Sequence, residues 1–220
     1  MAGDATNLMS ALFSSGWIGF AAAAIGLVLF LLILRRPSPV SRLPAHFVVV
    51  DIETTGLSAN TESIIEIAAI KVRLDEANHY AAHAALVDPG REVPPIITQL
   101  TGITSDMVRG RRGIDEEIQA FLDFVGPDPL VFYFAEFDMK FLRKAARAVG
   151  RAINNPVIDA VPIAHRAFPR APDHKLTTLA NLMGLSNAGA HRALHDCLTT
   201  LRLIQYARAK ETQGRNLGSA

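Results

Sequence analysis

Apolar residues along the chain fall into three kinds of segment. The first is one long run, "WIGFAAAAIGLVLFLLIL" at 17–34, inside a stretch from Ala5 to Leu34 that has no charged residue. Shorter β-rich runs bounded by turn residues indicate strands, and runs with apolar residues every three or four positions indicate helices. Strands are expected at 46–54, 63–74, 79–89 and 129–135, and in a short segment that follows Pro156.

The helical runs follow the third strand. Helices are expected at 113–126, 136–150, 175–185 and 191–210, with short helical turns at 97–104 and 105–110. Three strands in a meander, followed by strands that alternate with helices, predict an α/β fold with a mixed sheet and helices on its faces.

The long apolar run predicts a transmembrane helix at about 12–34. Its 18 most apolar residues would extend roughly 27 Å as a helix, close to the hydrocarbon core of about 30 Å. Two other interpretations fit less well. A cleaved signal peptide needs a basic segment before the apolar run, where only Asp4 is charged, and a buried core helix would show a polar stripe.

Basic residues after the run set the expected topology. Arg35, Arg36 and Arg42 follow its end, and the positive-inside rule places that end in the cytoplasm. We therefore expect a single-pass protein of a bacterial-type inner (cell) membrane, with the lipid bilayer as a partner and the C-terminal part in the cytoplasm. The expected boundaries are 1–34 for the N-terminal segment, 35–45 for a proline-rich linker, 46–212 for a compact domain and 213–220 for a flexible tail.

Charge and cysteine content exclude some classes of protein. The 22 Lys and Arg against 21 Asp and Glu give no strong polyanion-binding signature. The single cysteine excludes an intrachain disulfide and a cysteine-rich zinc site, and it suits a reducing compartment. The candidate chemistry therefore lies in the carboxylates.

"VVVDIETTGL" at 48–57 places two carboxylates at the end of a buried strand. Residues i and i+2 of a strand face the same way, so Asp51 and Glu53 project together. Asp138 lies at the start of a predicted helix and Asp196 in the last one. Such an oxygen-rich set suits two Mg²⁺ (or Mn²⁺) ions, which can clamp the attacking and leaving oxygens of a phosphoryl transfer. His191 is then a natural general base for the water.

Three motifs make the chain similar to a known family. "VVVDIETTGL", "FDMKFL" and "HRALHD", with "QLTGIT" and "HKLTTLANLMGL" between them, resemble the DEDDh (DnaQ-like) 3′–5′ exonucleases, whose fold is ribonuclease H-like with a mixed five-stranded sheet. The proofreading epsilon subunit of DNA polymerase III is of this type. The resemblance covers about 45–210. It implies that Asp51, Glu53, Asp138 and Asp196 are metal ligands and that His191 is the base.

The resemblance also suggests residues that border the 3′-terminal nucleotide: Thr54, Thr55, Gly56 and Leu57. One position departs from the family. Its middle motif usually reads His-Asn-Ala-x-Phe-Asp, whereas here Phe134 replaces the asparagine that often contacts the substrate. Two interpretations are open for Phe134, stacking on a base of the substrate or packing in the core beside Tyr133, and packing is slightly favoured.

Structural alternatives exist for each candidate. The Asp51–Glu53 pair can be a surface strand end, and Asp138 a helix N-terminal acid. His191 can be a helix-start residue and Asp196 a solvated helix acid. The basic stripe of α-helical spacing at Lys140, Arg143, Lys144 and Arg147 is most often a solvated face, although it suits a nucleic-acid backbone or anionic lipid.

These observations predict a membrane-anchored exonuclease that releases mononucleotides from free 3′ ends of nucleic acid, with single-stranded DNA favoured. Action on RNA or short oligonucleotides is the nearest alternative. A catalytically silent nucleic-acid-binding module and a membrane scaffold are the others. The chain ends about ten residues after its last predicted helix, so nothing indicates the C-terminal extension by which the polymerase subunit holds its partners, or a polymerase or clamp partner.

Overall fold

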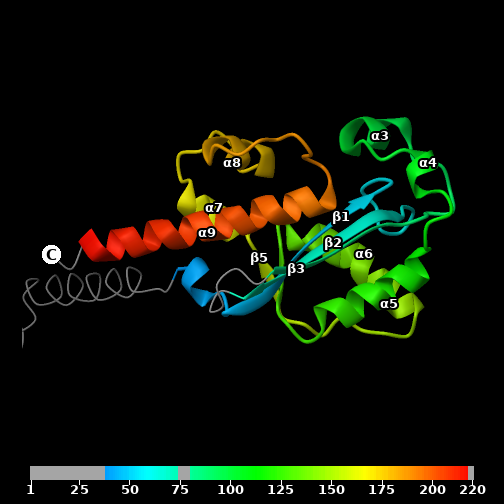
Figure 1. The fold of residues 1–220 in the computed structure, drawn as a ribbon, viewed down its shortest axis with the longest axis horizontal. Coiled ribbons are helices and arrows are strands. Elements are labelled where there is room, and N and C mark those ends of the chain that lie inside the picture. Colours follow the sequence, from blue (N-terminus) through cyan, green and yellow to red (C-terminus); the bar gives the residue numbers. More distant parts are fainter. Residues whose placement is uncertain (1–37, 74–79, 218–220) are drawn as a thin grey trace, which may run out of the picture. The chain divides into compact units, whose positions relative to one another are not determined.

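The computed structural model describes residues 38–73 and 80–217 (Figure 1). The predicted transmembrane helix at 12–34 lies outside these residues. Within the described part, no helix is both long and apolar enough to span a bilayer.

A five-stranded mixed sheet forms the centre of the domain, in the order β3-β2-β1-β4-β5. Strands β1, β2 and β3 pair antiparallel, whereas β4 and β5 run parallel to β1. This confirms the α/β fold with a mixed sheet that the order of the segments predicted, and the five-stranded, ribonuclease H-like sheet that the family resemblance implied. The strands are β1 (His46–Thr54), β2 (Ile64–Arg73), β3 (Tyr80–Leu86), β4 (Leu130–Phe132) and β5 (Val157–Asp159).

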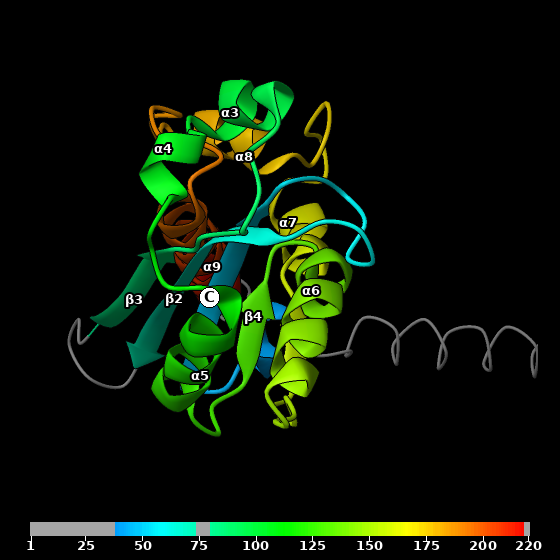
Figure 2. The same cartoon turned by 90° about the vertical axis from the view of Figure 1, so that its right-hand side faces the viewer.

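Helices cover both faces of the sheet (Figure 2). Helices α5 and α6 pack on one face, and α7 and α9 pack on the other. The helical elements are η1 (Val40–Arg42), α3 (Pro95–Thr101), α4 (Ser105–Val108), α5 (Ile114–Val125), α6 (Ala135–Ala148), α7 (Val161–Ala167), α8 (Leu176–Leu182) and α9 (Ala193–Leu217).

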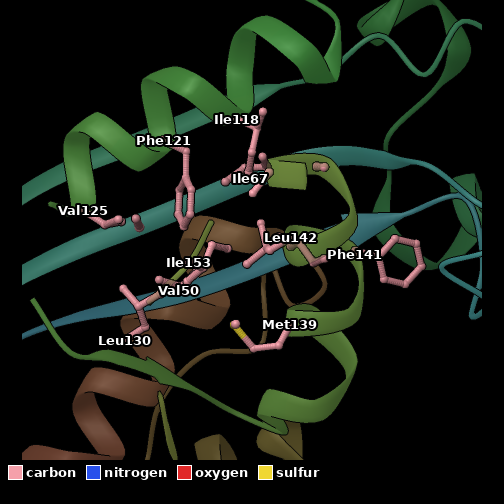
Figure 3. Packing of buried hydrophobic residues seen from close by; sticks show 14 of the residues in the cluster. Val50, Ile67, Ile118, Phe121, Val125, Leu130, Met139, Phe141, Leu142 and Ile153 are labelled. Atoms are coloured by element: carbon pink, nitrogen blue, oxygen red, sulfur yellow. The ribbon is translucent and has the colours of Figure 1, made fainter. Parts of the chain in front are cut away.

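Residues 47–50 of β1 are apolar without a break because both faces of the strand are buried there. Val48 and Val50 point to the α5–α6 side, where Phe121 of α5 and Leu142 of α6 pack beside them (Figure 3). Val49 points to the α7–α9 side. Because side chains alternate along a strand, the carboxylates of β1 follow Val49 onto the face that α9 covers.

Part of the expected linker belongs to the packed domain. Val40 and Leu43 are 2% and 7% exposed and join the cluster under α9, and the Leu43 carbonyl accepts a hydrogen bond from Arg208. Residues three apart lie on one side of a 3₁₀ turn, so two apolar residues suffice to hold this segment. The packed domain therefore begins before residue 46. At the other end, α9 continues to Leu217, beyond the expected boundary at 212.

Candidate active site

Asp51 and Glu53 lie in the last part of β1, beyond the point where β4 stops pairing with it. Strand β4 pairs with β1 only at Val48 and Val49. The backbone of β1 beyond these residues is therefore free to meet another element on that side, and the first turn of α6 takes this place.

Asp138 in that first turn is fixed by β1 itself. Its carboxylate Oδ1 accepts a hydrogen bond from the backbone N–H of Ile52 at 3.2 Å, and the residue is 3% exposed. Ile52 stands between Asp51 and Glu53, so this bond binds the third predicted carboxylate directly to the strand that carries the first two.

Asp196 and His191 approach from the other face of the sheet. Asp196 lies in the first turn of α9, and its Oδ2 accepts a hydrogen bond from the backbone N–H of His191 at 3.2 Å. His191 adopts a left-handed conformation with φ 60°. Ligand atoms of Glu53, His191 and Asp196 all lie within 4.8 Å of one another. The structure thus brings together the predicted residues of two distant motifs.

Burial is the largest cause that raises the pKa of each of the four carboxyls, and neighbouring carboxylates of the site add to it for Asp51 and Glu53. Burial raises the pKa of Asp51 well above its ordinary value, and the charges of Asp138, Asp196 and Glu53 raise it further. Burial, with Asp196 next, raises the pKa of Glu53 to about 8. Burial likewise raises the pKa of Asp138 to about 8, and burial raises the pKa of Asp196 above its ordinary value.

This donor set fits divalent cations. It consists of carboxylate oxygens in a desolvated place, and such oxygens are the ligands that Mg²⁺ and Mn²⁺ prefer. Like charges this close are costly unless protons or cations compensate them. Asp51, Glu53, Asp138 and Asp196 would hold the ions, and the group of Glu53, His191 and Asp196 marks one place where their atoms converge.

Glu66 and Arg192 form an ion pair behind the site that the sequence analysis missed. Glu66 of β2 lies opposite Glu53 of β1 and is 5% exposed. The Arg192 guanidinium donates to both of its carboxylate oxygens at 2.7–3.2 Å, and the Ala193 N–H donates to Oε2 at 2.8 Å. The pair ties the start of α9 to the sheet, and the Arg192 charge partly offsets the rise in the pKa of Glu53.

The residues expected at the 3′-terminal nucleotide form the turn after β1. The Thr54 and Thr55 side chains are buried; Thr54 donates to the Gly56 carbonyl at 2.6 Å and Thr55 to Glu62 at 2.6 Å. Both hydroxyls thus act as donors within the turn itself. Leu57 is 87% exposed at its tip.

Phe134 does not pack in the core. Its side chain is 60% exposed, and the residue has φ 75° at the N-cap of α6. The favoured expectation of core packing is therefore wrong, since the left-handed backbone interrupts the alternation of strand β4 and turns the side chain outward. Tyr133 is the one that packs inward, where its hydroxyl donates to the His174 carbonyl.

Half of the basic stripe on α6 has partners within the domain. Lys140 pairs with Glu136 at 2.8 Å. Lys144 donates to the carbonyls of Ala59 and Asn60, in the segment that follows the β1 turn. Lys144 therefore connects α6 to that segment.

The geometry agrees with the family resemblance. Residues 48–204 match the RNase T exonuclease family. The chain belongs to this exonuclease family. The predicted relation to DEDDh (DnaQ-like) enzymes is confirmed by curated relatives, among them the DNA polymerase III epsilon subunit of Aquifex aeolicus, which is 35% identical over 163 residues covering 74% of this chain and 80% of that protein. The predicted enzyme class, a hydrolytic exonuclease, is confirmed as well.

Other relatives of this exonuclease are much larger. The PolC-type DNA polymerase III of Clostridium perfringens is 38% identical over 162 residues, which make up 74% of this chain but 11% of that protein. The chain thus spans about a tenth of the PolC-type relatives it matches.

Solved structures agree on the fold of this exonuclease. Exonuclease X, solved in complex with 5′-overhanging duplex DNA, has a TM-score of 0.58 at 25% identity, over 74% of this chain and 92% of that one. E. coli exonuclease I, solved with single-stranded DNA in a zinc-bound form, has a TM-score of 0.65 at 17% identity, over 77% of this chain and 42% of that one.

The raised carboxyl pKa values predict how the stability of the metal-free exonuclease depends on pH. Between the ordinary carboxyl pKa near 4 and the values of about 8 for Glu53 and Asp138, the folded protein binds more protons than the unfolded chain. Its free energy of unfolding therefore falls as the pH rises through this window. With a chelator present to remove metal ions, the melting temperature should be lower at pH 8 than at pH 5.5. Added Mg²⁺ or Mn²⁺ should raise it more at pH 8, because protons compete less for the ligands.

Asp138→Asn is the comparison variant, since it removes one titrating carboxyl from the same place. Its melting temperature in chelator should fall less between pH 5.5 and pH 8 than that of the wild type. Equal pH dependence in the two proteins, together with no metal effect at pH 8, would rule out a cation site built on these carboxylates.

Proposed function

We propose that this protein is a membrane-anchored 3′–5′ exonuclease that releases mononucleotides from free 3′ ends, with single-stranded DNA as the favoured substrate and two Mg²⁺ or Mn²⁺ ions as cofactors. The observation that carries the proposal is the meeting of Glu53, His191 and Asp196 within 4.8 Å, with Asp138 bonded to the backbone of β1 between Asp51 and Glu53. A set of desolvated like charges lowers the stability of the fold. Binding of cations for catalysis explains why such a set is present.

The carboxylates and His191 would have different roles in the reaction. The four carboxylates would hold the ions, which when bound stabilise charge on the attacking and leaving oxygens. His191 lies within reach of the same place, since its ring nitrogen is within 4.8 Å of oxygens of Glu53 and Asp196. It would accept the proton of the attacking water. The hydrogen bond from the backbone N–H of His191 to Asp196 holds the proposed base, His191, beside a proposed metal ligand, Asp196.

The proposed preference for DNA rests on what the neighbours in fold were solved with. Two neighbours in fold were solved with DNA, one of them single-stranded and the other with a 5′ overhang. RNA is the alternative substrate, and labelled RNA beside labelled single-stranded DNA separates the two. The relatives also include polymerase components, so a polymerase partner is a second possibility to be tested by co-purification.

Asp51→Asn tests the catalytic part of the proposal. Removing one ligand should lower nuclease activity by more than about 100-fold, because loss of outer-sphere partners alone commonly costs about 10–100-fold. The metal-free variant should melt at a temperature equal to or above that of the wild type, since a repelling charge is gone. Product release from a 3′-labelled oligonucleotide and thermal melting are the measurements.

Glu136→Gln is the matched control for Asp51→Asn. It removes an exposed carboxylate from the same turn of α6 that carries Asp138, and it should keep wild-type activity. Mg²⁺-dependent activity of Asp51→Asn near the wild-type level would contradict the assigned ligands.

His191→Asn tests the base. Asparagine tolerates the left-handed backbone of this position, so the loop should keep its conformation while the imidazole is lost. The expected result is a kcat lower by about 10²–10⁴ with little change in the Mg²⁺ concentration needed for half-maximal rate. A kcat within twofold of the wild type would place the base elsewhere.

The membrane anchor is tested by fractionation. We propose that residues 12–34 cross the inner membrane and leave the exonuclease domain in the cytoplasm, as the uncharged run and the following arginines indicate. The full chain should then stay in membranes during carbonate extraction, and a reporter fused after Arg42 should read as cytoplasmic. Extraction by carbonate, a periplasmic reading or a cleaved N-terminus would each contradict this arrangement.

A further inference from the structure

Phe134 combines two unfavourable features at one position. Its ring is 60% exposed, and its backbone has φ 75°, a region that bulky side chains rarely occupy. In the described part of the chain, only His191 shares a positive φ with Phe134 among residues other than glycine. Strained residues of this kind cluster at functional sites, and His191 belongs to the proposed site already.

The conformation of Phe134 is imposed by its surroundings. The carboxylate of Asp159, at the end of β5, accepts hydrogen bonds from the N–H groups of Phe134 at 3.4 Å, Ala135 at 3.1 Å and Val161 at 2.8 Å. These bonds hold the backbone at the junction of β4 and α6. Asparagine or glycine would adopt the same backbone at lower cost, so nothing in the fold itself calls for an aromatic ring there.

The backbone of Phe134 lies about one helical turn from Asp138. Phe134 directly precedes α6, and Asp138 follows four residues later, a rise of about 6 Å along a helix. Strands β4 and β1 are parallel neighbours, so the segments that follow them emerge at the same edge of the sheet. Leu57, the most exposed of the large apolar residues, emerges from the end of β1.

We propose that the Phe134 ring stacks on one of the two bases that flank the bond to be hydrolysed, and that this contact favours single-stranded 3′ ends. The inference rests on the proposed function. A phosphodiester held at the carboxylates carries a base on either side, and an unpaired base offers a free π-face to an aromatic ring. A base inside a duplex is already stacked and paired. The phenyl ring has no hydrogen-bonding group, so the contact is indifferent to base identity.

The charge of the neighbouring helix supports this mode of binding. Lys140 and Lys144 of α6 are engaged with Glu136 and with backbone carbonyls, which leaves fewer cations for the phosphate backbone. Apolar contact with bases then supplies affinity that depends little on salt, whereas phosphate contacts weaken steeply as salt rises.

Phe134→Asn in the full chain separates binding from stability. Its affinity for a single-stranded oligonucleotide should fall by about 5- to 150-fold, the loss expected for one stacked base. Its melting temperature should equal or exceed that of the wild type, because asparagine suits the left-handed backbone. Phe134→Tyr keeps the ring and should bind within twofold of the wild type.

An oligonucleotide whose last two residues are abasic completes the test. The wild type should bind it more weakly than the intact strand, and Phe134→Asn should bind both with nearly the same affinity, since the ring and its base act as one pair. Tyr80→Asn is the matched control: it removes an exposed aromatic ring opposite Val72, which pairs with Phe47 near the start of β1, the end away from the carboxylates. It should leave binding unchanged.

Binding is measured by anisotropy in Ca²⁺, so that it does not depend on turnover. Wild-type affinity in Phe134→Asn, or an equal loss on intact and abasic strands, would overturn the stacking contact. If the wild type shows no turnover with Mg²⁺ or Mn²⁺, that result would instead contradict the proposed function. The binding affinities of the variants could still be compared, because they do not depend on turnover.

Discussion

Repulsion among carboxylates at the end of β1 is the constraint on which the site depends. Backbone donors orient two of the acids, Asp138 through the Ile52 N–H and Asp196 through the His191 N–H, and the His195 ring also contacts Asp196 at 3.3 Å. Such bonds orient a carboxylate without cancelling its charge. The nearby guanidinium of Arg192 is committed to Glu66. The negative charge of the site is therefore left for cations from solution, at the cost of stability in their absence.

Much of the fold and site follows from local sequence. The apolar run of β1 predicts a strand buried on both faces, and the alternation of side chains places Asp51 and Glu53 on one side. Asp138 stands in the first turn of α6, whose apolar residues recur at clear helical spacing. Asp196 stands in the first turn of α9, which lacks such a pattern, and the family resemblance marked it. The agreement has a physical basis, since strand ends and helix starts are where a packed fold can bring polar groups together.

The rest depends on contacts that no local pattern encodes. Glu66 and Arg192 are 126 residues apart, and an acid within the apolar run of β2 shows its partner only once the strand and α9 are packed. Phe134 was misplaced because its conformation is set by Asp159 from β5, 25 residues on. Val40 and Leu43 gave too short an apolar signal to mark a packed segment. In each case a contact with a residue distant in the sequence determines the conformation or packing, and the local sequence preference does not.

Helix α9 also fixes how far the chain's entry point lies from the chemistry. Asp196 is in its first turn, and Arg208, which donates to the Leu43 carbonyl, follows twelve residues later, a rise of roughly 18 Å. Whatever precedes Leu43 thus joins the domain well away from the carboxylates. Substitutions near Leu43 and substitutions among the carboxylates therefore act on separate parts of the domain, and one can be altered without the other.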